Sequence, residues 1–82
     1  MNITELYRLF LAHPNITTDS RNCPEHAIFF ALKGENFDGN GFAEKAIENG
    51  ASYAVIDNPR YQKDERFLLV ANALETLREA MS

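Results

Sequence analysis

Apolar positions in the first third of the chain predict one helix and two strands. Residues 2–12 predict a helix, because their apolar side chains recur along one stripe: Ile3, Leu6, Leu9 and Phe10. We expect this helix to end at His13-Pro14, since a proline pushes the residue before it out of the helical region. The β-branched segment 16–18 predicts a short strand. The continuous apolar run 27–32 predicts a strand that is covered on both faces.

A glycine-rich segment and a second amphipathic segment follow this run. Residues 33–41 hold three of the four glycines and predict a loop. A helix is expected to begin near Phe42, with three side chains facing inward: Phe42, Ala46 and Ile47. Gly50 is expected to end this helix as a left-handed C-cap.

The last third of the chain predicts two strands and a helix. The apolar segments 52–56 and 67–70 predict strands, and the polar segment 60–66 predicts a loop. Asn72, helped by Glu75, is expected to cap a final helix. We expect the buried face of this helix to carry Leu74, Leu77 and Met81.

The order of these elements predicts an α/β fold. The strand–helix–strand segment 27–56 is short enough for a right-handed parallel crossover. The expected architecture is a small, mostly parallel or mixed sheet with helices packed on it. Residues 1–82 are expected to form a single domain.

Composition and charge narrow the class of protein. The net charge is −4, and the eight Lys and Arg residues are scattered, which argues against a nucleic-acid partner. No apolar stretch reaches the length of a membrane span, and the amino terminus lacks a secretory pattern. Cys23 is the only cysteine, so no internal disulfide can form. We expect a cytoplasmic protein with no membrane partner.

Two short polar loops, each at the end of a strand-like run, carry the candidate chemistry. Thr18 and Ser20 offer hydroxyls, and Arg21 offers a planar guanidinium that can donate hydrogen bonds to an oxyanion. In the second loop Lys33 is a point charge, and the glycines let the main chain approach a ligand. The two loops together predict a pocket for a ligand rich in oxygen atoms.

The same residues also fit a purely structural role. Asp19 and Ser20 can form a turn, Arg21 can pair with a nearby carboxylate, and the glycines can simply turn the chain. Neither loop has the phosphate-cradling pattern that ends in Gly-Lys-Ser/Thr. His13 and His26 lack a nucleophile partner or further metal ligands, so we expect no catalytic residue and no metal site.

A set of short motifs resembles the amino-terminal domain of the Mur ligase family. The motifs run in order along the chain: Asp19-Ser20-Arg21, nine further residues, Ala31-Leu32-Lys33-Gly34-Glu35, Asp38-Gly39, Phe42, Ala46 and Gly50-Ala51. The resemblance covers residues 16–57 well and the rest of the chain loosely.

This resemblance implies a larger parent enzyme of peptidoglycan precursor synthesis. Its amino-terminal domain would bind a UDP-N-acetylmuramoyl-peptide. A central ATPase domain and a carboxy-terminal domain, both outside this chain, would use ATP and Mg²⁺. The chain alone is expected to hold no cofactor and to be non-catalytic. Within the family it looks most like the branch that adds D-Ala-D-Ala, the alternatives being the branch that adds the third stem residue and a stand-alone interaction module.

The resemblance also implies substrate-binding residues. Thr18 and Ser20 would lie near the uridine, and three residues of the second loop would line the same pocket: Glu35, Asn36 and Phe37. Four more positions match the motifs and either bind or shape the loops: Arg21, Lys33, Asp38 and Gly39.

Two positions depart from the family pattern. The family usually has Gly-Asp before the second strand, where this chain has His26-Ala27. A His or Arg commonly follows Asp-Gly in the family, and here Asn40 stands there, which removes one possible phosphate contact.

Overall fold

A parallel four-stranded sheet forms the centre of the molecule in the computed structural model, which describes residues 8, 11, 15–34 and 38–81. The described strands lie in the order in which they follow one another along the chain: β1 (Ile16–Thr17), β2 (Ile28–Phe30), β3 (Tyr53–Ile56) and β4 (Phe67–Leu69). Every neighbouring pair is parallel, with Ile28 opposite both Ile16 and Tyr53. The predicted α/β fold is therefore confirmed, with a sheet that is parallel throughout.

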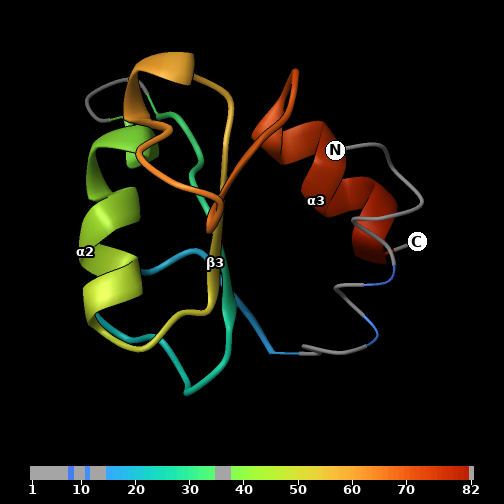
Figure 1. Cartoon of the computed structure of the whole chain (residues 1–82). Coiled ribbons are helices and arrows are strands. Elements are labelled where there is room, and N and C mark those ends of the chain that lie inside the picture. The colour runs from blue at the N-terminus through green and yellow to red at the C-terminus, as the bar shows by residue number, and fades with distance from the viewer. Residues whose placement is uncertain (1–7, 9–10, 12–14, 35–37, 82) are drawn as a thin grey trace.

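Two α-helices cover opposite faces of this sheet, α2 (Ala43–Glu48) and α3 (Ala73–Met81) (Figure 1). Two 3₁₀-helices, η1 (Gly39–Phe42) and η2 (Pro59–Tyr61), occupy segments that the sequence predicts as loop or turn. The helix predicted at 2–12 lies outside the described residues, apart from Arg8 and Leu11, which are helical. Within the described ranges, no helix has the length and apolar character that a membrane crossing needs.

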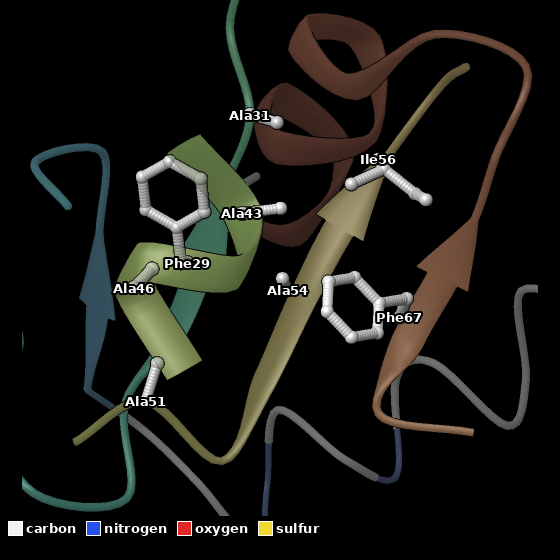
Figure 2. Close-up of a cluster of buried hydrophobic side chains, with 8 residues drawn as sticks. All are labelled: Phe29, Ala31, Ala43, Ala46, Ala51, Ala54, Ile56 and Phe67. Atoms are coloured by element: carbon white, nitrogen blue, oxygen red, sulfur yellow. The ribbon is translucent and has the colours of Figure 1, made fainter. Parts of the chain in front are cut away.

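Each face of the sheet has its own buried cluster, because successive side chains of a strand point to opposite faces. Figure 2 shows the cluster on the α2 side: Phe29, Ala31, Ala43, Ala46, Ala51, Ala54, Ile56 and Phe67. The other cluster holds Ile28, Phe30, Val55 and Leu68, with Leu77 of α3 packed against it. A strand buried on both faces needs an apolar side chain at every position, which explains the unbroken run 27–31.

Two predicted core residues are instead exposed. Phe42 is 48% exposed because it belongs to η1, and α2 begins one residue later with Ala43 against the sheet. Leu74 is 43% exposed, since α3 meets the sheet through Ala73 and Leu77, four residues apart on one face. The prediction that Phe42 and Leu74 face inward is therefore wrong.

The predicted helix ends at Gly50 and Asn72 are confirmed. Gly50 has a φ of +119°, and the amides of Gly50 and Ala51 donate to the carbonyls of Ile47 and Ala46, respectively. The Asn72 side chain accepts a hydrogen bond of 2.9 Å from the Glu75 amide. Both caps satisfy backbone groups that a helix end leaves without partners.

The turn before β2 has a backbone that glycine usually provides. His26 has a φ of +65°, in the left-handed region. Its amide donates to the Gly50 carbonyl at 3.1 Å, which ties this turn to the end of α2. At the sequence departure His26-Ala27, a histidine therefore adopts a conformation that glycine usually provides.

A matched pair of glycine substitutions tests how closely the chain packs at the end of β2. A Cβ at Gly39 would lie 2.7 Å from the Leu32 amide nitrogen and closer still to the Leu32 carbonyl oxygen, whereas one at Gly41 meets nothing within 4 Å. We expect Gly39→Ala to lower the free energy of unfolding by about 2 kcal/mol or more, because backbone must move. Gly41→Ala should change it by less than about 0.5 kcal/mol. Urea titrations measure both, and equal effects would contradict the close approach.

Candidate functional site

A groove of about 650 Å³ opens beside the carboxyl ends of β1 and β2. Parallel sheets commonly bind ligands at this edge, where loops from neighbouring strands meet. The groove is lined by Thr18, Asp19, Ser20, Arg21, Phe29, Leu32, Gly39, Phe42 and Lys45. Its walls come from the loop after β1, the end of β2 with the chain that follows, and the start of α2.

The loop after β1 is held in shape by its own hydrogen bonds. The Thr17 hydroxyl accepts from the Asp19 amide at 3.1 Å and lies 3.2 Å from the Asn22 carbonyl, to which it can donate. Asp19 Oδ1 accepts from the Arg21 amide at 2.9 Å and lies 3.4 Å from Arg21 Nε. The Arg21 amide and guanidinium hold the pKa of Asp19 below its ordinary value, against a smaller opposing effect of burial. The structural role that the sequence left open, a turn with Arg21 paired to a carboxylate, is thus present.

The α2 side of the groove is a stripe of three residues, Phe42, Lys45 and Asn49. Their spacing of three and four residues places them along one side of a helix. Phe42 and Lys45 line the groove, and Asn49 Nδ2 donates to the Ser20 carbonyl at 2.8 Å. This last bond fixes the loop after β1 against the end of α2, and so sets one dimension of the groove.

The predicted site residues separate into three groups. Thr18, Ser20, Arg21 and Gly39 line the groove together, although they come from two loops that are distant in the sequence. Lys33 and Asp38 are not among the lining residues. Glu35, Asn36 and Phe37 lie outside the described residues.

Lys33 and Asp38 belong instead to a polar network around Asn40, which is 0% exposed. Asn40 Nδ2 donates to Asp38 Oδ1 at 2.7 Å and to Asp57 Oδ1 at 2.9 Å, and Asn40 Oδ1 accepts from the Asp57 amide at 3.0 Å. Lys33 Nζ lies 3.6 Å from Asp57 Oδ1. The network joins the loop after β2 to the end of β3.

Asp57 extends this network to α3. Its Oδ2 accepts from the Ala73 amide, the first residue of α3, at 3.0 Å. Burial alone would raise the pKa of Asp57, but the Ala73 amide, the Asn40 side chain and the Lys33 ammonium together lower it. A carboxylate at the start of a helix also complements the helix dipole.

Sequence reasoning missed the apolar and cationic lining of the groove. Phe29 and Leu32 belong to the predicted strand run, but nothing in that run shows which residue reaches an edge. Phe42 and Lys45 are spaced three residues apart, and this spacing was a usable signal. The spacing was not used as a signal, because the predicted helix placed Phe42 on its buried face.

A family model described as the Mur ligase family, catalytic domain, matches residues 14–82. The chain therefore belongs to the Mur ligase family. Two curated relatives of this chain are ligases with different names within the family. The UDP-N-acetylmuramoyl-L-alanyl-D-glutamate–2,6-diaminopimelate ligase of Rickettsia typhi is 32% identical over 80 residues, which is 98% of this chain and 16% of that protein. The UDP-N-acetylmuramoyl-tripeptide–D-alanyl-D-alanine ligase of Bacillus subtilis is 33% identical over 88 residues, which is 95% of this chain and 19% of that protein.

Solved structures of the same family share the fold. The MurF ligase of Thermotoga maritima, in complex with ADP, gives a TM-score of 0.73 at 29% identity over 80% of this chain and 15% of that chain. A MurF structure from Acinetobacter baumannii gives 0.66 at 36% identity over 77% of this chain and 14% of that chain. The chain thus spans less than a fifth of the length of these relatives.

Removing the Asn40 side chain tests the network that holds the groove's edge. In Asn40→Ala, Asp38 and Asp57 each lose a buried hydrogen-bond donor, so we expect the free energy of unfolding to fall by about 2–3 kcal/mol. Asn22→Ala, at an exposed position, should cost less than about 0.5 kcal/mol. Chemical denaturation of the three proteins measures this, and a variant at position 40 as stable as the one at position 22 would contradict the role of the network.

The lowered pKa of Asp57 predicts a dependence of stability on pH. Because the pKa is lower in the folded state than in the unfolded state, the charged carboxylate stabilises the fold above the ordinary value, about pH 4. That contribution is lost as the pH falls through the folded-state pKa. The difference in unfolding free energy between the wild type and Asp57→Asn should therefore shrink between about pH 6 and about pH 3. A difference that stays constant over this range would contradict the assignment.

Proposed function

We propose that this chain is the substrate-recognition domain of an ATP-dependent ligase of peptidoglycan precursor synthesis. In this proposal the groove holds the UDP end of a UDP-N-acetylmuramoyl-peptide. The observation that carries the proposal is the meeting of Thr18, Ser20 and Arg21 with Gly39 around one groove. Family membership and the names of the relatives, which are ligases of UDP-N-acetylmuramoyl peptides, support the choice of ligand.

The lining of the groove suits the parts of a nucleotide. Leu32 and Phe42 offer apolar and aromatic surface for a planar base. The Thr18 and Ser20 hydroxyls can donate to or accept from the oxygens of a base or a ribose. Gly39 lets the backbone at the groove's edge lie close to the end of β2, since a side chain there would clash. A volume of about 650 Å³ is within the usual range for small-molecule sites.

The resemblance also indicates which group the parent ligase would join to the UDP-N-acetylmuramoyl-peptide. We propose D-Ala-D-Ala, in line with the solved MurF structures that share this fold. Addition of the third stem residue is the alternative, because a diaminopimelate ligase is similar to this chain over nearly all of its length. In either case we propose that residues 1–82 form the amino-terminal domain of a three-domain parent.

ATP and Mg²⁺ would serve the parent enzyme elsewhere in its chain. Among the described residues there is no group of three or more His, Cys, Asp or Glu side chains that could hold a metal ion. Neither polar loop has the Gly-Lys-Ser/Thr pattern that cradles phosphates. These residues do not fit ATP with its metal, and we assign no chemical step to them. We propose that the 82-residue chain alone binds without ligating.

Titration with UDP, followed by amide chemical shifts, tests the proposed function. We expect the amides of Thr18, Ser20 and Gly39 to shift at millimolar UDP, while those of the η2 segment 59–61 stay in place. Thr18→Val removes one hydroxyl and should weaken binding roughly three- to tenfold, the value of one hydrogen bond. Thr76→Val, on α3 outside the groove, is the matched control and should bind as the wild type does. No shift at the groove amides would contradict the proposal.

A further inference from the structure

Lys45 is a cation of the groove that the sequence-based site does not include. It lines the groove together with Arg21 and with the carboxylate of Asp19. Asp19 Oδ1 is already engaged by Arg21, through the backbone amide at 2.9 Å and Nε at 3.4 Å. Lys45 Nζ has a distant ion partner in Glu48, at 3.9 Å, and both side chains are about three-fifths exposed. An exposed pair at this distance contributes little, so the Lys45 ammonium is available to a ligand.

The position of Lys45 on α2 directs it toward the loop after β1. It lies between Phe42 and Asn49 on the stripe that faces this loop, and Asn49 is bonded to the Ser20 carbonyl at 2.8 Å. Lys45 lines the same groove as Thr18 and Ser20. The helix and the loop therefore place these three residues on two walls of one groove.

Lys33, the cation that the sequence predicts for the ligand, is engaged elsewhere. Its Nζ lies 3.6 Å from Asp57 Oδ1, and Asp57 is mostly buried, with a side chain 11% exposed. Moving Lys33 to a ligand would remove one favourable charge from that carboxylate. Lys33 therefore serves the Asn40 network and Arg21 is paired with Asp19, which leaves Lys45 as the groove cation with the most distant carboxylate partner.

We propose that Lys45 binds the diphosphate of the UDP ligand and so makes the groove prefer UDP over uridine. The ammonium would act as a point charge that donates to a phosphate oxygen. Phe42, one turn earlier on the same stripe, would contact the base or the ribose. This proposal rests on the proposed function, because it assumes that the groove holds a uridine nucleotide.

The test compares the affinities of UDP and uridine in two charge-matched variants of the chain. Lys45→Met and Lys63→Met each remove one positive charge from a protein of net charge −4, and Lys63 does not line the groove. We expect Lys45→Met to weaken UDP binding about fivefold and to leave uridine binding unchanged. Lys63→Met should bind both as the wild type does. Lys45→Arg keeps the charge and should retain UDP affinity within about twofold.

Each outcome decides between the two proposals. If the wild type prefers UDP and Lys45→Met keeps that preference, the role of Lys45 is overturned while the proposed function stands. An equal loss in Lys63→Met would also overturn it, because the effect would then come from net charge alone. A wild type that binds neither uridine nor UDP would overturn both. Dispersed amide spectra of each variant show that its fold is intact.

Discussion

The buried amide of Asn40 is the interaction on which the arrangement of this domain depends. An amide both donates and accepts, so it can join two aspartates without adding a charge to the interior. Here it bonds Asp38, which caps η1, and Asp57, which follows β3. Two carboxylates near each other repel, and the donors from Asn40, Lys33 and Ala73 offset that repulsion. Lys33 and Asp38 after β2, the end of β3 and the start of α3 are thereby held in one arrangement.

This arrangement places the groove at the carboxyl edge of the sheet. The strands are short, so the loops after β1 and β2 begin close to the core. The loop after β1 is held by its own hydrogen bonds and by Asn49, while Asp38, after β2, is held by Asn40. The described residues on both sides of the groove are therefore anchored by hydrogen bonds within the protein. A preformed groove lowers the entropy that binding must overcome.

Elements with local signals could be predicted from the sequence. The apolar run at β2, Gly50 after α2 and Asn72 before α3 each carry a pattern that acts within a few residues. The predicted fold class and the meeting of Thr18, Ser20 and Arg21 with Gly39 at one edge agree with the structure, because parallel strands bring their following loops together.

The rest depends on contacts between residues that are distant in the sequence. Asn40 and Asp57 are 17 residues apart, and Asn49 and Ser20 are 29 apart. No local pattern shows that Asn40 is buried or that Lys33 turns to Asp57. The exposure of Phe42 was missed for a smaller reason, since a shift of one residue in the helix start changes which side chain meets the sheet.

The alanines of α2 have a consequence for the width of the groove. Ala43 and Ala46 are the fully buried contacts of this helix, and with no long side chain between them and the sheet the helix axis lies close to Phe29 (Figure 2). A bulkier residue at either position would lift the helix, and Phe42 and Lys45 would move with it. The spacing between the helix and the opposite loop is therefore set by two methyl groups that are fully buried. Repacking the interior at these two positions would therefore change the width of the groove while every residue that lines it stays the same.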